Sequence, residues 1–286
     1  MRRFCAVLLC ALMLCSASCA KVYLDSPPRE NWYQSPLLRL TVLDTDQSDC
    51  MLLQCGGEAM MVDGGSEPFR EDLKKMVEEK GVTRFKYLLN THFHEDHISG
   101  LQWLMRYGFP ADAYLHPYND AFATEISFRH RDTLAQAARS GIPTRQIFHG
   151  DELMLGEAVI TLARHDDGES TNARSVVARV DFGGASLLLT ADIIGRTQTW
   201  LLNTMPEGWL DADIVKMPHH GVTPMVTAFL QAASPQAVFM TNNLARVDKA
   251  RVQVEKYDFP TFYTGDGTVV FETDGEDWYV YQGLRP

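Results

Sequence analysis

The stretch THFHEDHISG, residues 91–100, places three histidines and two carboxylates within six consecutive positions. His92 and His94 alternate, so in an extended backbone their side chains point the same way. Asp96 and His97 follow at the start of a predicted helix with one apolar face. The turn between the two halves brings two sets of nitrogen and oxygen donors together. Zinc, iron and manganese accept imidazole and carboxylate ligands, so the stretch predicts a site for two neighbouring metal ions.

The chain before this motif reads as strands followed by a helix. Apolar runs separated by a polar turn and by a glycine pair predict three strands. A helix should follow, with Ser66 as its cap, Pro68 in its first turn and Gly81 at its end. A further apolar run, RFKYLLN, suits a buried strand that delivers the chain to the metal-binding stretch. The three earlier strands are predicted at Leu38–Leu43, Cys50–Cys55 and Ala59–Val62.

Two later strands also end in groups that bind metals. ASLLLTAD ends at Asp192, and a carboxylate at a strand end can lie between two cations and bind both. DIVKMPHHG ends at His219 and His220, whose adjacent side chains point in different directions. One of them is expected to bind metal and the other to donate to the substrate or orient a ligand, with the choice left open. Lys216 is either a surface lysine or a charge near the substrate.

These stretches resemble the metallo-β-lactamase-fold hydrolases, whose signature corresponds to His92-x-His94-x-Asp96-His97. Four further stretches resemble the hydrolase domain of ComEC-type DNA-uptake proteins and their stand-alone relatives. The resemblance runs from about Leu38 to Tyr281 and implies an α/β (α+β) fold, a four-layered αββα sandwich with a metal site at one edge. The four stretches are TVLDTDQSDCMLLQCGGEAMMVDGGS, NARSVVARVDFGGASLLLTADI, DADIVKMPHHGVTP and FYTGDGTVVFETDGEDWYV.

The resemblance implies a centre of two divalent metal ions, with zinc expected first and manganese or iron as alternatives. Asp192 would bridge both ions. The implied ligands are His92, His94, Asp96, His97, Asp192, His219 and His220, the last two as alternatives.

Many members of this family place a further histidine ligand between the first motif and the bridging carboxylate. The matching region here is ARHDDGESTNARS, and the resemblance puts Asn172 near that position. His165 is the only histidine nearby, and which of the two fills the position stays open. Asn172 and Lys216 are the candidates for substrate binding.

From this resemblance we expect a metal-dependent hydrolase, and the composition of the amino terminus predicts that it is exported. A metal-bound hydroxide would attack a phosphodiester, in extracellular nucleic acid or in an envelope polymer. Asp96 would orient or shuttle the proton, and His219 or His220 would assist the leaving group. Two alternatives stay open. One is a hydrolase of the same fold acting on a lactone, thioester or β-lactam, and the other is a catalytically weak binding or accessory protein.

The amino terminus has the composition of a secretory signal peptide. Arg2 and Arg3 precede an apolar run, Phe4–Leu14, that is too short to span a bilayer. We expect cleavage after Ala20, or a membrane anchor through lipidation of Cys19, in a protein secreted or attached to the outer face of the membrane. Residues 1–20 are assigned to the signal peptide, 21–36 to a short tether and 37–284 to one hydrolase domain.

The net charge of the 286-residue chain is −11. High-affinity nucleic-acid binding relies on Lys and Arg against phosphate, so it is not expected. Metal ions can still give a cleft local positive charge. A phosphodiester substrate, either a small molecule or a polymer, is therefore still expected.

The remaining cysteines and histidines carry no motif. Cys50 and Cys55 are five positions apart in one predicted strand, so they face opposite sides and no disulfide is expected. His116, His130 and His149 are expected to lie at the surface, or to be buried with hydrogen-bond partners for their ring nitrogens. Residues Asn119–Ser140 are predicted as a helix ended by Gly141, and the resemblance makes this helix a candidate substrate wall.

Overall fold

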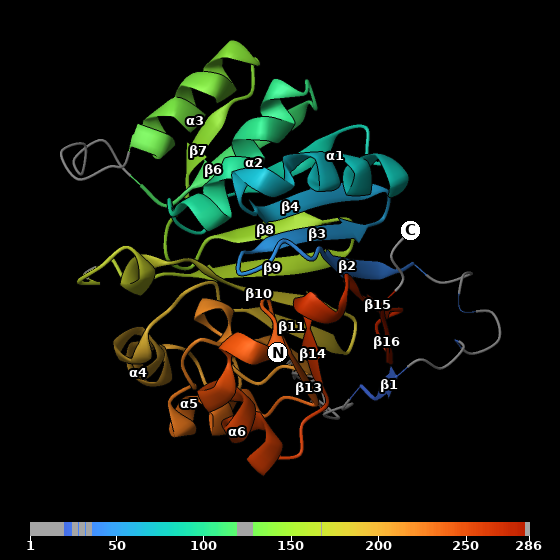
Figure 1. Cartoon of the computed structure of the whole chain (residues 1–286), viewed down its shortest axis with the longest axis vertical. Coiled ribbons are helices and arrows are strands. Elements are labelled where there is room, and N and C mark those ends of the chain that lie inside the picture. Colours follow the sequence, from blue (N-terminus) through green and yellow to red (C-terminus); the bar gives the residue numbers. More distant parts are fainter. Residues whose placement is uncertain are drawn as a thin grey trace, which may run out of the picture.

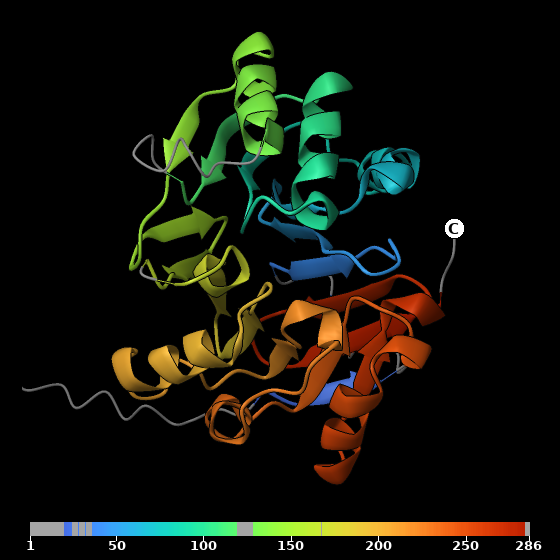
Figure 2. The same cartoon turned by 60° about the vertical axis from the view of Figure 1, so that its left-hand side comes forward.

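The computed structural model of the chain describes residues 20–24, 28, 32, 36–118, 128–166 and 168–283. These residues form two β-sheets packed face to face, with helices on the outer face of each (Figure 1). Turning the molecule shows the same order of helices, sheet, sheet and helices (Figure 2). This confirms the predicted four-layered αββα sandwich.

Among the described residues, the larger sheet has nine strands and combines antiparallel and parallel pairing. Its strands in spatial order are β1 (Val22–Leu24), β16 (Trp278–Gln282), β15 (Val269–Thr273), β2 (Leu38–Val42), β3 (Cys50–Cys55), β4 (Glu58–Gly64), β5 (Phe85–Leu89), β6 (Ala111–His116) and β7 (Thr144–Gln146). Strands β2, β3 and β4 pair antiparallel, whereas β4 to β7 pair parallel.

The smaller sheet has seven strands and also combines the two kinds of pairing. Its strands in spatial order are β14 (Thr261–Tyr263), β13 (Ala237–Met240), β12 (Ile214–Lys216), β11 (Ala185–Leu189), β10 (Val177–Phe182), β9 (Ala158–Ala163) and β8 (Glu152–Leu155). Strands β11 to β14 run parallel, so their carboxyl ends lie at one edge of the sheet.

Three helices cover each sheet. Those on the larger sheet are α1 (Arg70–Glu79), α2 (Glu95–Arg106) and α3 (Phe128–Arg139), and those on the smaller sheet are α4 (Gly195–Thr204), α5 (Thr227–Ala233) and α6 (Asp248–Lys256) (Figure 1). Buried apolar residues form one core between the sheets, around Leu53, Ile160 and Phe271, and one core under each set of helices. Burial of apolar area in these three layers is the main force that holds the sandwich together.

The predicted elements before the metal-binding stretch are largely confirmed. The strand Cys50–Cys55 has the predicted bounds, and both cysteines are free and buried, as expected. The cap assigned to Ser66 is wrong, because its side chain makes no capping hydrogen bond. A short 3-10 turn, Glu67–Phe69, comes between Ser66 and α1, since Pro68 fits this tighter turn and the α-helix begins at Arg70.

Part of the predicted tether belongs to the larger sheet. Val22–Leu24 form β1, which pairs in parallel with β16, and the ring of Tyr23 stacks on that of Tyr279 at 5.1 Å. Trp32 is buried and meets the same Tyr279 ring edge-on at 4.4 Å. These contacts arise because apolar and aromatic residues of the segment cover an otherwise open strand. The predicted signal peptide lies outside the described residues except for Ala20, and so does the first part of the predicted helix Asn119–Ser140.

Candidate metal centre

The metal-binding stretch begins in the loop between β5 and α2 and continues into α2, as the sequence predicts. His92 is buried, and its Nε2 lies 3.1 Å from Nδ1 of His94. The Nδ1 of His92 faces the Thr91 hydroxyl at 3.1 Å, which leaves Nε2 turned toward His94. The two imidazoles therefore converge on one point, as their alternation in an extended backbone requires.

Helix α2 supplies the second half of the stretch from its first turn. Asp96 is partly exposed, with 28% of its side chain open to solvent, whereas His97 is buried. The Nε2 of His97 lies 4.0 Å from an Asp96 carboxylate oxygen. Its Nδ1 lies 2.7 Å from Oδ2 of Asp63, at the end of β4. A carboxylate on one ring nitrogen fixes the ring and leaves the other nitrogen aimed into the centre.

Asp192 links the two halves. It follows β11 and is buried, and its Oδ2 lies 3.4 Å from Nε2 of His97 and 3.8 Å from Nε2 of His92. The same oxygen lies 3.4 Å from Nε2 of His220 and 3.9 Å from Nε2 of His219. One carboxylate thus reaches imidazoles from three separate segments of the chain.

The structure separates the two adjacent histidines that follow β12. His220 is buried, and its Nε2 lies 3.2 Å from Asp96 as well as beside Asp192. His219 keeps 35% of its side chain exposed at the rim. Both have a positive φ, 50° for His219 and 53° for His220, a backbone conformation that is uncommon for non-glycine residues. Strained backbone of this kind is held by its surroundings and clusters at functional sites.

Two carboxylates that the sequence analysis missed hold the buried histidines from behind. Besides Asp63 on His97, Asp49 places Oδ1 3.2 Å from Nδ1 of His220. The Thr241 hydroxyl donates to Asp49 at 2.6 Å and lies 2.9 Å from the same Nδ1. Asp49 immediately precedes β3 and Asp63 lies within β4. The signal in the sequence for these two residues is an acidic side chain at or near the end of a predicted strand.

The donor set fits two divalent cations. Three sets of side chains have ligand atoms within 4.8 Å of one another, and Asp192 or His97 belongs to each. The Nε2 atoms of His97 and His220 and the Oδ1 of Asp192 are buried and have no hydrogen-bond partner among the described residues. Buried polar atoms are normally satisfied, and a metal ion would satisfy these three. The three sets are Asp49 with His97, Asp192 and His220; Asp63 with His92 and His97; and His92 with His94 and Asp192.

Charges divide the centre into two unlike parts. Burial alone would lower the pKa of His220, but Asp192 and Asp49 raise it to about 10. Burial is likewise outweighed at His97, where Asp192 and Asp63 raise the pKa well above its usual value. Burial prevails at His92 and His94, whose pKa values are lowered. Without metal, therefore, the imidazoles of His97 and His220 are in the protonated, cationic form at neutral pH. A bound metal ion would replace the extra proton of each ring.

Lys216 is not where the sequence analysis placed it. It is fully buried, and its ammonium lies 2.9 Å from Oδ2 of Asp49. It also donates to the carbonyls of Ala191 at 3.0 Å and Met217 at 3.3 Å. A buried ammonium needs such partners, so Lys216 is neither a surface lysine nor a substrate contact. Burial alone would raise the pKa of Asp49, but Lys216 and His220 hold it well below its usual range.

Asn172, not His165, lies beside the centre. Asn172 begins a 3-10 turn, Asn172–Arg174, and its Nδ2 lies 3.5 Å from Nε2 of His219. Its Oδ1 is buried without a hydrogen-bond partner among the described residues. The ring of His165 instead stacks on Trp200 at 4.7 Å. His116 and His130 pack ring against ring at 4.9 Å and belong to none of the three sets.

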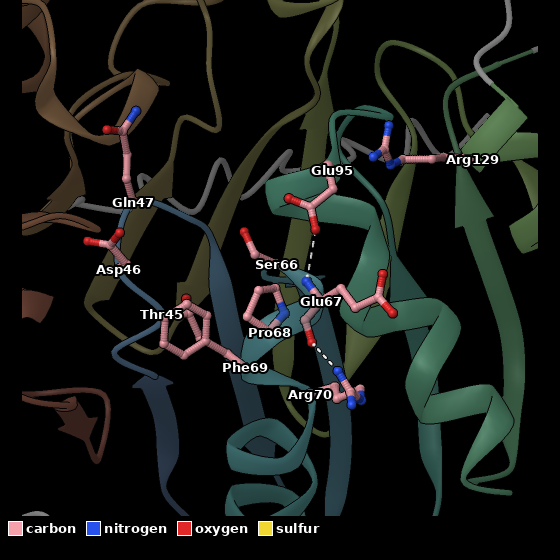
Figure 3. A pocket seen from close by; sticks show the side chains of 10 residues that line it. All are labelled: Thr45, Asp46, Gln47, Ser66, Glu67, Pro68, Phe69, Arg70, Glu95 and Arg129. Carbon is pink, nitrogen blue, oxygen red and sulfur yellow. Dashed lines mark hydrogen bonds between the residues drawn. The ribbon is translucent and has the colours of Figure 1, made fainter.

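A pocket of about 840 Å³ opens beside the amino terminus of α2 (Figure 3). Glu95 reaches into it and accepts a hydrogen bond from the backbone N–H of Glu67 at 2.9 Å. Its lining carries the carboxylates of Asp46, Glu67 and Glu95 and the guanidinium groups of Arg70 and Arg129. The pocket therefore carries charges of both signs.

The chain is similar to known proteins in sequence and in fold. ComE operon protein 3 of Bacillus subtilis (strain 168) is 24% identical over 224 residues, which make up 70% of this chain and 28% of that protein. The chain thus spans less than a third of the length of this relative. The solved structure of CmlA, a diiron beta-hydroxylase from Streptomyces venezuelae, superposes with a TM-score of 0.51 at 14% identity, over 83% of this chain and 53% of CmlA.

A second solved structure, the metallo-beta-lactamase fold protein YhfI from Bacillus subtilis, has a TM-score of 0.49 at 14% identity, over 79% of this chain and 95% of that one. The family model described as the metallo-beta-lactamase superfamily matches residues 43–237, which contain every candidate ligand named above. The resemblance found in the sequence is thereby confirmed, and the chain belongs to the metallo-β-lactamase superfamily.

Proposed function

We propose that this protein is an exported, metal-dependent hydrolase that cleaves phosphodiesters in extracellular nucleic acid or in a phosphate-containing envelope polymer. The observation that carries the hydrolase part is Asp192. Its Oδ2 lies within 4 Å of imidazoles on both sides, so one carboxylate can serve two cations. Zinc suits the imidazole and carboxylate donors best, and manganese or iron would also be accepted.

The ligands would form two unequal positions. His92, His94 and Asp192 surround the first, and Asp96, His97, Asp192 and His220 surround the second. The resemblance puts Asn172 where many members of the family have a further histidine ligand, so the first position would have one ligand fewer. A substrate oxygen can therefore approach the first position more easily than the second.

When bound, the two cations lower the pKa of a water molecule and stabilise the negative charge that develops on a phosphoryl group. Asp96 is partly exposed, so its carboxylate would be placed to orient a water molecule and to exchange a proton with solvent. His220 is enclosed by Asp49, Asp96 and Asp192, which suits a ligand. His219 at the rim is the histidine that can assist the leaving group, and the Asn172 amide can donate to a substrate oxygen.

The choice of phosphodiester rests on Asn172 in place of a histidine ligand, on the stretch from Lys216 to Gly221 and on the similarity to ComE operon protein 3. The net charge of −11 argues against tight binding along a nucleic acid, so the metal ions would provide most of the attraction for phosphate. We expect short or transiently bound substrates.

Export is proposed from the basic, short and apolar amino terminus, with cleavage after Ala20 or lipidation at Cys19. In the part of the chain that the structure describes, no helix is both long and apolar enough to cross a bilayer. Amino-terminal sequencing of protein from the native host should find Lys21 or a modified Cys19 first. An intact Met1 on the folded protein would contradict export.

A substrate panel tests the reaction class. Zinc- or manganese-loaded protein should hydrolyse bis-p-nitrophenyl phosphate faster than p-nitrophenyl phosphate, a chromogenic lactone or nitrocefin. Chelation should abolish turnover and added metal should restore it. Efficient nitrocefin or lactone turnover without diester cleavage would favour the lactamase-like alternative, and metal binding without any turnover would favour an accessory protein.

A further inference from the structure

The ammonium of Lys216 connects three segments that build the metal centre. It donates to the carbonyl of Ala191, the residue before Asp192, and to that of Met217, which leads into the His219-His220 pair. It also lies 2.9 Å from Asp49, which comes from the loop between β2 and β3. These three partners belong to strand ends of both sheets, so one side chain ties the two halves of the sandwich together at the centre.

Two partners of Lys216 contact different histidines of the centre. Asp49 Oδ1 faces Nδ1 of His220 at 3.2 Å, while its Oδ2 faces the ammonium. The carbonyl of Ala191 accepts from Lys216 and also from the backbone N–H of His219 at 3.0 Å. Ala191 itself has a positive φ of 45°, as do the two histidines, so this stretch of backbone is held in an unfavourable conformation by such bonds.

A stability role alone does not explain a buried lysine here. Removing two charges from water costs free energy that their attraction often fails to repay, and a buried ion pair can commonly be replaced by apolar residues. Lys216 is 0% exposed, and the residues on the same face of the sheet, Ile214 of β12 and Phe239 of β13, which is the register partner of Lys216, are buried and apolar. An apolar side chain would suit that environment, so the ammonium has another use.

We propose that Lys216 is a positioning residue that assembles the metal position of Asp96, His97, Asp192 and His220. It does so by orienting Asp49 behind His220. The inference rests on the proposed two-metal centre but not on the substrate. Within the described part of the chain, Lys216 has no hydrogen bond or ion pair with His92 or His94, whose ring nitrogens face Thr91, Asp192 and each other. The lysine should therefore affect one metal position more than the other.

The test compares variants of the full chain by metal binding rather than by turnover. The variants are Lys216→Met, Lys216→Arg and the double variant Asp49→Asn/Lys216→Met, called the neutral pair because both charges are removed. The control is Lys86→Met, which removes a lysine from a part-buried ion pair with Glu58, 2.7 Å long, between the neighbouring strands β4 and β5 of the larger sheet. Cobalt(II) titration followed by visible absorption, with metal content measured directly, reports on each position. Thermal melting of metal-free protein reports on folding.

Lys216→Met should bind one equivalent of cobalt as the unaltered protein does and the other roughly 10- to 100-fold more weakly, the usual effect of losing a group that orients a ligand. Lys216→Arg should recover part of that affinity, and the control should bind both equivalents normally. If Lys216→Met does not fold, the neutral pair should fold and show the same selective loss. Normal affinity and an unchanged cobalt spectrum in the folded variants, or equal weakening of both positions, would overturn the proposal.

Discussion

Gly100 of helix α2 lies directly against Gly64 at the end of strand β4. The N–H of Gly100 donates to the carbonyl of Gly65 at 3.0 Å. A methyl group on Gly100 would clash with the Gly64 carbonyl oxygen and stand 2.7 Å from Cδ2 of Leu73. Only a residue without a side chain allows this approach, and it sets His97, one turn earlier on the same helix, beside Asp63.

Gly100→Ala should therefore destabilise the protein and loosen the metal centre together. The clash involves backbone, so it cannot be relieved by turning a side chain, and overpacking of this kind costs about 1–3 kcal/mol of unfolding free energy. Chemical denaturation and metal content measure the two effects. Gly195→Ala is the matched control, because its methyl group would meet only Val226 Cγ2 at an ordinary 3.5 Å. Equal stability of the two variants would contradict the account of the helix contact.

Metal affinity should rise with pH. Without metal, Asp192 and Asp49 overcome burial and raise the pKa of His220 to about 10, and the pKa of His97 is also raised. A metal ion must displace both protons, so near neutral pH the logarithm of the association constant should increase by about two per pH unit. Calorimetric titration in buffers of different ionisation enthalpy counts the released protons. Binding without proton release at pH 7 would contradict the assigned protonation.

The stability of the metal-free protein should change with pH in the opposite direction. A histidine whose pKa is higher in the folded state stabilises that state fully below its unfolded value, 6.5. This stabilisation is lost as the pH rises toward the folded value of about 10. Denaturant midpoints of metal-free protein should therefore fall between pH 7 and pH 10. A flat or rising profile over this range would mean that the buried histidines are neutral.

Asp192→Asn should lower the content of both metal ions, because one carboxylate oxygen serves both positions. The amide keeps the shape of the side chain but removes its charge. His116→Ala is the comparison, since His116 packs against His130 away from the three ligand sets. Metal analysis after dialysis checks the result. Equal retention in the two variants would reject Asp192 as a shared ligand.

The adjacent histidines should separate in their effects. His220→Ala removes a buried imidazole beside Asp96 and Asp192, so it should lose metal and activity together. His219→Ala removes an imidazole at the rim, so it should keep metal and lose turnover. Metal content and diester hydrolysis measured on the same samples distinguish the two. Loss of metal from His219→Ala alone would exchange the assignments.

The elements that the sequence predicts well are those whose signal is local. The alternation of His92 and His94, the start of a helix at Asp96 and the strands before Asp192 and His220 follow from short-range patterns. Since parallel strands end at one edge of a sheet, those patterns also bring the candidate ligands together. The choice between His219 and His220 needed the left-handed backbone at both residues, which no spacing reveals.

The errors concern contacts between distant segments. Lys216 was assigned to the surface or to the substrate because its partner Asp49 lies 167 positions earlier in the chain, and a lone lysine in a strand gives no sign of a buried pair. Asp49 and Asp63 were missed for the same reason. The strand Val22–Leu24 was assigned to a tether because it pairs with residues at the other end of the chain.

The central claim is that Asp192 lies between two metal ions, and anomalous diffraction from crystals of zinc-loaded protein tests it most directly. The account predicts two anomalous peaks that both contact Asp192, one also bound by His92 and His94 and the other by Asp96, His97 and His220. A single peak that leaves either group of histidines without metal at saturating zinc, or no peak next to Asp192, would contradict it.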